Sequence, residues 1–235
     1  KVVLVLLTAK YQKGKLMHYK IFENVIDKKL INDIFTFYNN SKTYTTNGMH
    51  KVEQPWTLEV VRNLEPILSN YFDTSLENIG DNIYKHDFPY FPHVDISKAG
   101  YPCFNVLIPI KVENDIEQKF CVFDQYVNDY SAGATWVGKL YNAMKEFEHN
   151  KKRRFIFKDS IVENKTEKDI DEDFYVNYLE YRGRDRTMFK SCSGVALDFT
   201  PGNLIMFDSK YIHCTGKMDC KWKVGLSLRF KGSFE

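Results

Sequence analysis

Two histidines and one aspartate have the residue types and the spacing of a metal site. One residue separates His93 from Asp95, so on an extended segment both side chains project from the same face. His213 follows 120 residues after His93, beyond a strand-like segment at 202–207 and a turn around residues 208–209. Two imidazoles and a carboxylate leave one face of an octahedral Fe(II) open, whereas zinc prefers a tetrahedral site. We therefore predict that His93, Asp95 and His213 bind iron and form the catalytic centre.

Other histidines fit this chemistry less well. His86 and Asp87 are adjacent, so on a strand their side chains would point to opposite faces. His18, His50 and His149 have no carboxylate two residues later, and we expect ordinary surface or core positions for them. A histidine and an aspartate at this spacing also occur by chance, so a surface pair is the alternative for His93 and Asp95.

The last strand-like segment alternates polar and apolar residues. Lys223, Gly225, Ser227 and Arg229 share one parity, and the intervening positions are apolar. We expect the polar side to point into a barrel, where a buried cation needs an anion. Arginine offers a carboxylate two parallel donors and lysine a point charge, so either residue could bind one. The alternative is an edge strand whose two cations face solvent.

A second polar face precedes the metal motif. Asn82 and Tyr84 are two residues apart and lie eleven and nine residues before His93. An amide and a phenol on one strand face could both donate hydrogen bonds to the same carboxylate.

Short β-rich runs separated by turn residues predict the elements that must position these side chains. They lie at 83–86, 104–112, 119–127, 154–157, 194–199, 204–207 and 222–230, a spacing typical of a jelly-roll barrel. Helical patterns begin at Asp27 and after Thr57, and Pro66 should split the second of them. Extended segments at 2–7 and 16–22 precede these helices.

We predict one domain over residues 1–235, mainly β with flanking helices. Residues 1–80 supply strands and supporting helices, and residues 81–235 form the barrel. An insertion at about 118–193, with a helix at 135–149 and a charged stretch at 150–173, is expected to lie over the barrel mouth. The sequence does not indicate an oligomeric state.

The composition of the chain limits which binding partners and which cellular compartment we expect. Hydrophobic residues make up 43% of the chain and charged residues 27%, which favours a folded protein. The net charge of +2 gives no support to nucleic-acid binding. Five cysteines without a CxxC motif suit reduced thiols, and no run approaches the ~20 apolar residues of a membrane span. We expect a cytoplasmic protein without membrane association.

In combination, these motifs resemble the Fe(II)/2-oxoglutarate-dependent dioxygenase superfamily from Tyr84 to Phe230. In that superfamily a basic residue follows the distal histidine by ten to seventeen positions, and Lys223 and Arg229 lie at ten and sixteen. Lys223 matches prolyl- and lysyl-hydroxylase-like members, and Asn82 and Tyr84 with the two cations are similar to AlkB-like members. Residues 201–208 are similar to the turn and strand before the distal histidine in phytanoyl-CoA-hydroxylase-like proteins. The subfamily stays open.

The resemblance implies a double-stranded β-helix of the cupin-like, jelly-roll type. It implies Fe(II) as cofactor and 2-oxoglutarate and dioxygen as co-substrates, with hydroxylation of a small-molecule or peptidyl substrate and release of succinate and CO2. Asp95 argues against a halogenase, because halogenating members lack this carboxylate. Asn82, Tyr84, Lys223, Ser227 and Arg229 would bind the 2-oxoglutarate.

Two other functions remain as alternatives. An AlkB-like nucleic-acid demethylase is suggested by the basic run at 151–154 and by Arg182, Arg184 and Arg186, although acidic residues surround both. A non-catalytic, cupin-like metal-binding or scaffold protein is the second alternative.

Overall fold

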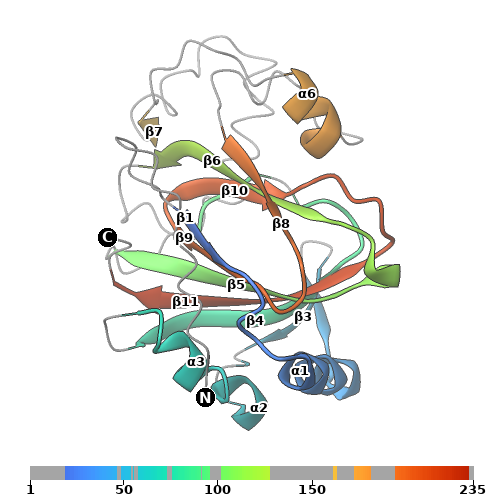
Figure 1. Ribbon diagram of the computed structural model, residues 1–235, viewed down its shortest axis with the longest axis vertical. Helices are drawn as coiled ribbons and strands as arrows, with labels where there is room; N and C mark the ends of the chain where they lie inside the picture. Colours follow the sequence, from blue (N-terminus) through green and yellow to red (C-terminus); the bar gives the residue numbers. More distant parts are fainter. Residues whose placement is uncertain are drawn as a thin grey trace.

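Two antiparallel β-sheets face each other in a computed structural model of the chain (Figure 1). The structure describes residues 19–46, 49–53, 55, 58–72, 76–90, 92–95, 102–127, 161–162, 172–180 and 194–232. The arrangement is a double-stranded β-helix, so the predicted jelly-roll fold is confirmed.

The larger sheet has seven described strands in the order β1-β9-β5-β11-β4-β3-β2. Four of these, β9, β5, β11 and β4, run side by side through its centre, and β11 is paired along its length with both β4 and β5. The strand bounds are β1 Tyr19–Phe22, β2 Tyr44–Thr46, β3 Met49–Glu53, β4 Asn78–His86, β5 Cys103–Val112, β9 Leu204–Asp208 and β11 Lys223–Lys231.

The smaller sheet is built around β6, which pairs with three other strands. Its register joins Cys121 to Cys214 on β10 and to Ala196 on β8, and β7 pairs with its C-terminal end. The bounds are β6 Lys119–Val127, β7 Ile161–Val162, β8 Gly194–Asp198 and β10 Tyr211–Thr215.

Three N-terminal helices cover the outer face of the larger sheet (Figure 1). Helix α1 (Lys28–Asn40) begins at Asp27, whose carboxylate accepts a hydrogen bond from the Leu30 amide at 2.8 Å. The second predicted helix is divided into α2 (Glu59–Arg62) and α3 (Glu65–Leu68). Pro66 lies in the first turn of α3, where its missing N–H is not needed, so the predicted split is confirmed.

The alternation along β11 separates the two faces of the larger sheet. Val224, Leu226, Leu228 and Phe230 are fully buried in the apolar core between this sheet and the helices. That core also contains Ile34 of α1 and Leu68 of α3. Burial of these apolar side chains therefore fixes the register of β11. The alternate residues, from Lys223 to Arg229, face the smaller sheet.

Several predicted boundaries differ from the structure. The insertion predicted at about 118–193 begins too early, because β6 is a barrel strand paired with β8 and β10. The short strands β2 and β3 and the ligand-bearing strand β10 were not predicted. The sequence analysis also did not predict two helical segments. One is α6 (Glu172–Phe174), which continues as a π-helix at Tyr175–Leu179, and the other is a 3-10 turn at Glu113–Asp115. The expected elements at 2–7, 135–149 and 154–157 lie outside the described residues.

Among the described residues, no helix combines the length and the apolar character needed to cross a membrane.

The packing of α1 against the sheet can be tested at Ile34. Its side chain has no exposed surface, and we expect Ile34→Ala to lower the free energy of unfolding by about 2–5 kcal/mol. The exposed Asn32 on the same helix is the control, and Asn32→Ala should change stability by less than about 0.5 kcal/mol. Urea unfolding measures both, and equal effects would contradict the described core.

Candidate metal centre and its cavity

A backbone bridge brings His93 next to His213. The His93 amide donates to the His213 carbonyl at 3.0 Å, and the His213 amide donates to the His93 carbonyl at 2.9 Å. The segment around His93 thus lies along β10 as a short antiparallel neighbour. Val94 is buried on the opposite side, as the alternation of an extended chain requires. The predicted common orientation of His93 and Asp95 follows from this extended geometry.

The His213 ring is fixed by a hydrogen bond and by aromatic contacts. Its Nδ1–H donates to the Tyr211 carbonyl at 2.9 Å, which leaves the lone pair on Nε2. The register between β10 and β6 shifts between Tyr211 and His213, as it does at a β-bulge. Phe207 packs at 4.5 Å between ring centroids, and the His93 ring lies 4.2 Å away.

Asp95 connects the metal centre to the larger sheet. Its amide donates to the Ser209 carbonyl at 2.9 Å. Its two carboxylate oxygens contact Arg229 Nη2 on β11 and Asn105 Nδ2 on β5, both at 3.0 Å. Arg229 Nε also donates to the Asn105 side-chain oxygen at 3.2 Å, which closes a three-residue network. The carboxylate therefore has a fixed orientation.

The charge of Asp95 is stabilised by its neighbours. Burial by itself would raise the pKa of this carboxyl, but the charge of the Arg229 guanidinium outweighs burial and holds the pKa well below its usual range. Asp95 is therefore ionised, as a metal ligand must be.

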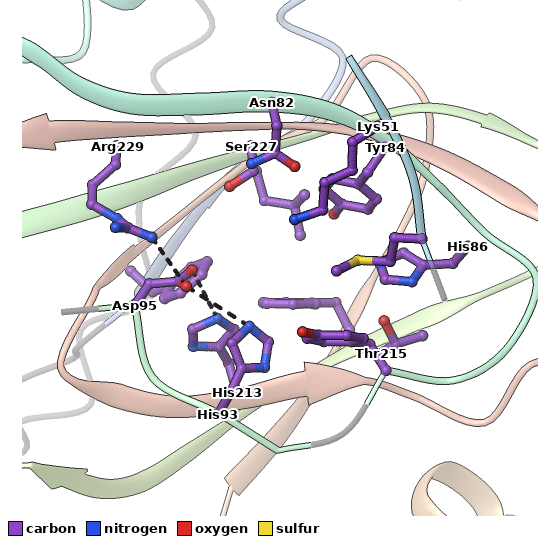
Figure 2. Close-up of a pocket in the computed structure, with 15 residues that line it drawn as sticks. Lys51, Asn82, Tyr84, His86, His93, Asp95, His213, Thr215, Ser227 and Arg229 are labelled. Carbon is purple, nitrogen blue, oxygen red and sulfur yellow. Dashed lines mark ion pairs between the residues drawn. The ribbon is translucent and has the colours of Figure 1, made fainter. Parts of the chain in front are cut away.

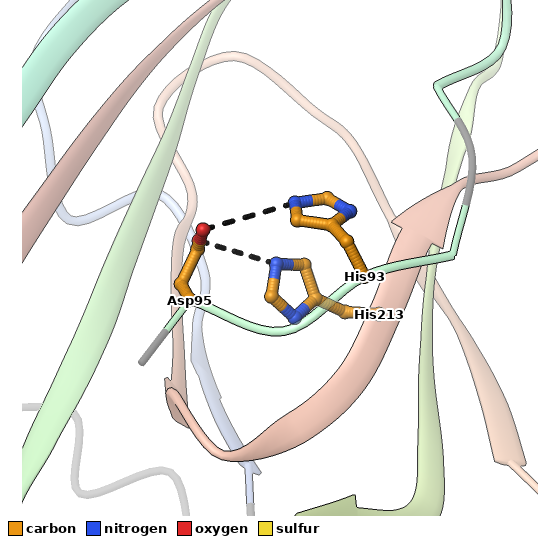
Figure 3. A group of neighbouring side chains, drawn as sticks. All are labelled: His93, Asp95 and His213. Carbon is orange, nitrogen blue, oxygen red and sulfur yellow. Dashed lines mark ion pairs between the residues drawn. The ribbon is translucent and has the colours of Figure 1, made fainter. Parts of the chain in front are cut away.

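The three side chains have the geometry of a metal site (Figure 3). One donor atom from each lies within 4.8 Å of the others. His213 Nε2 is 3.3 Å and His93 Nε2 is 3.9 Å from the carboxylate oxygens of Asp95. Adjacent ligands on one octahedral ion are about 3 Å apart when the metal–ligand bonds are about 2.1 Å. The donor set and its spacing thus fit a divalent transition metal with further positions open.

A cavity of about 190 Å³ adjoins these residues (Figure 2). Its walls come from both sheets. The larger sheet contributes polar side chains from β3, β4 and β11, and Leu107, Phe120 and Phe207 belong to the apolar part of the lining.

Four of the five residues predicted to bind 2-oxoglutarate line this cavity: Asn82, Tyr84, Ser227 and Arg229. Burial, and then the negative charge of Asp95, raise the pKa of the Tyr84 hydroxyl, so this group remains a hydrogen-bond donor. The predicted inward orientation of the polar face of β11 is confirmed. The assignment of these residues to a co-substrate remains a prediction.

Lys223, the fifth predicted residue, is not part of the cavity lining. Its side chain is 1% exposed, and its Nζ lies 4.1 Å from the centroid of the Phe199 ring. A Cβ atom on Gly225 would lie 2.8 Å from the Tyr84 hydroxyl and 3.2 Å from Phe199. Tyr84 and Phe199 thus lie side by side over Gly225, and Lys223 lies against the Phe199 ring. Of these three residues, Tyr84 is the one that lines the cavity.

The sequence analysis missed three residues that contribute to the site. Lys51 and Met49 enter the cavity from β3, a short strand without apolar alternation, and nothing in the sequence marked them. Asn105 is a polar residue in the otherwise apolar run of β5, and this exception was a usable signal. His86 also lines the cavity but does not belong to the three-ligand group, as predicted.

No family model matches the sequence, and no curated protein matches it either. Similar solved structures exist, however. The chain aligns with the epimerase SnoN from nogalamycin biosynthesis, in complex with Fe3+, alpha ketoglutarate and nogalamycin RO, at 11% identity and a TM-score of 0.55, over 91% of this chain and 78% of SnoN.

A second similar structure is HygX from Streptomyces hygroscopicus with nickel and 2-oxoglutarate bound. It aligns at 10% identity and a TM-score of 0.52, over 92% of this chain and 84% of HygX. At these identities the likeness concerns the fold. The chain thus has the jelly-roll fold that these 2-oxoglutarate-binding proteins share.

The basic residues at 151–154 and at positions 182, 184 and 186 lie outside the described residues. The nucleic-acid alternative therefore stays a prediction.

The close contact over Gly225 gives a test of the cavity wall. We expect Gly225→Ala to destabilise the protein by about 1–3 kcal/mol, because the new methyl group must displace the Tyr84 ring. In a Tyr84→Ala background the same change should cost much less. Thermal unfolding of the four proteins in this double-mutant cycle measures the difference, and equal costs in both backgrounds would contradict the described packing.

Proposed function

We propose that the protein is an Fe(II)- and 2-oxoglutarate-dependent oxygenase that hydroxylates a C–H bond and releases succinate and CO2. The observation that carries this proposal is the group of His93, Asp95 and His213 at the wall of a cavity in a double-stranded β-helix. The comparisons support the choice of cofactor and co-substrate, because SnoN and HygX are similar structures that contain a metal ion and 2-oxoglutarate.

His93 Nε2, Asp95 and His213 Nε2 would hold the iron. When bound, Fe(II) supplies the open positions at which 2-oxoglutarate and dioxygen combine and the oxidising power for a substrate C–H bond. The protein's own part begins with ligand orientation. Tyr211 fixes the tautomer of His213, and Arg229 and Asn105 fix the carboxylate of Asp95.

Binding 2-oxoglutarate requires a partner for the carboxylate that is distant from the metal. Arg229 is already engaged by Asp95 and Asn105, so we assign this task to Lys223. Lys223 is 1% exposed and its Nζ packs against Phe199, so it would bring a positive charge to the buried end of the co-substrate. The protonated Tyr84 hydroxyl lies beside Phe199 and would donate to the same carboxylate. Asn82 and Ser227 are paired with each other, Ser227 four residues beyond Lys223 on β11, and they would donate to the rest of the co-substrate.

The apolar part of the cavity suits oxidation chemistry. Leu107, Phe120 and Phe207 form the wall near His213, and Phe207 and Phe120 pack against its ring. Such a wall limits the access of water to the reacting centre. Hydroxylation is the simplest use of the site, because it requires only that a substrate C–H bond lie beside the metal. The epimerase SnoN indicates that this fold supports other reactions as well.

Consumption of 2-oxoglutarate tests the proposal directly. Purified protein with Fe(II), ascorbate and oxygen should form succinate, and His93→Ala and Asp95→Ala should lower that rate at least about 100-fold because a ligand is lost. His50→Ala on β3 is the matched control and should leave the rate unchanged. Anaerobic calorimetry with Fe(II) should show a parallel loss of binding. If all four proteins form succinate equally, or none does, the proposal is wrong.

We make a separate prediction that Lys223 and Arg229 have different roles, the first in binding 2-oxoglutarate and the second in orienting Asp95. Lys223→Met should raise the apparent KM for 2-oxoglutarate about 10–100-fold, the effect of losing a hydrogen bond to a charged group. Arg229→Met should instead weaken Fe(II) binding, because Asp95 loses its closest cation, and should change the KM less at saturating iron. Melting curves confirm that both variants fold. Equal and negligible effects on KM would mean that neither residue binds the co-substrate.

A further inference from the structure

A second cation, Lys51, enters the cavity from β3, a strand that carries none of the residues assigned to the metal or to 2-oxoglutarate. Lys51 lies on β3 directly opposite Tyr84 of β4 in the sheet register. Figure 2 shows its side chain descending beside Tyr84 into the cavity, on the side away from His93, Asp95 and His213. A strand pairing fixes this position more firmly than a loop would.

Charge is distributed unevenly between the two sides of the cavity. Asp95 is the one carboxylate among the described residues that line it, and Arg229 and Asn105 hold this group at the metal side. Next to Lys51 and Tyr84 on β3 and β4, the cavity is lined by the neutral side chains of Met49 and His86. A ligand that occupies this side therefore meets a positive charge and no negative one from the described lining.

Burial and nearby positive charges both act on His86. His86 lies on β4, opposite Lys223 on β11, and lines the cavity. Burial, together with the charges of Lys223, His93 and Lys51, holds the pKa of His86 well below its usual range. Lys51 and Lys223 thus act on one ring from two neighbouring strands, and His86 remains neutral and adds no charge of its own.

We propose that Lys51 forms an anion subsite for the primary substrate, so that the molecule to be oxidised carries a carboxylate or phosphate group. This inference rests on the proposed function, in which Lys223 takes the distant carboxylate of 2-oxoglutarate. The Lys51 ammonium then binds the substrate's anionic group, and the rest of the substrate extends toward the metal side. Lysine suits this purpose because a point charge accepts an anion from several directions.

Benzoate and benzamide form a matched pair of probes for this subsite, since they differ in charge and hardly in shape. Calorimetry on protein loaded with Mn(II) and saturating 2-oxoglutarate measures their affinities without turnover. We expect benzoate to bind about tenfold more tightly than benzamide, as a charge-assisted hydrogen bond implies. Lys51→Gln should abolish this preference, and Lys51→Arg should retain most of it.

Lys85→Gln is the matched control. Lys85 is on β4 next to Tyr84, but its side chain faces the other way and its Nζ lies 5.0 Å from the Trp222 ring centroid. The benzoate preference should survive this change. The inference is overturned if benzoate and benzamide bind equally, if benzoate does not bind, or if Lys51→Gln keeps the preference.

The same titrations separate this inference from the proposed function. Failure of the protein to bind 2-oxoglutarate with Mn(II) would contradict the oxygenase proposal before any probe is added. Normal 2-oxoglutarate binding with no benzoate preference would contradict the Lys51 subsite alone. If benzoate instead competes with 2-oxoglutarate, Lys51 belongs to the co-substrate and the inference is wrong.

Discussion

The pair of backbone hydrogen bonds between His93 and His213 is the constraint on which the site depends. These residues are far apart in the sequence, and each amide donates to the other's carbonyl. The bridge attaches the His93 segment to β10 at this one residue pair, and the two imidazole ring centroids lie 4.2 Å apart. A side-chain contact could slide, but a reciprocal backbone pair fixes the register. The position of Asp95 follows, because it is two residues along the same extended segment.

Asp95 then links the two sheets electrostatically. Its backbone belongs to the segment beside β10, while the partners of its carboxylate, Arg229 and Asn105, stand on the larger sheet. The orientation of a ligand therefore depends on the distance between the sheets, which is set by the apolar core around the barrel. Packing of residues remote from the cavity is thus coupled to the geometry of the metal centre.

Much of this arrangement could be predicted from the sequence, and the reasons for failure are physical. Ligand types at fixed spacing identified His93, Asp95 and His213, and alternation predicted which side of β11 faces inward. Lys51 could not be found, because β3 contains no apolar alternation and acquires its place only through pairing with β4. The partners of Asn105 lie 10 and 124 residues away, a relation that local patterns do not encode. The run at 119–127 was correctly predicted as a strand, but the bounds of the insertion included it, because its pairing with β8 and β10 is also a long-range relation.

The pairing of β6 with β8 has a consequence for how this scaffold can diversify. Phe123 of β6 is opposite Gly194 of β8, so the chain leaves the barrel and re-enters it on adjoining strands. The cost of closing a loop across such a short gap grows only slowly with loop length. All three metal-binding candidates and their supporting partners lie outside residues 128–193. Evolution, or a designer, could therefore change parts of that segment and keep these residues in place.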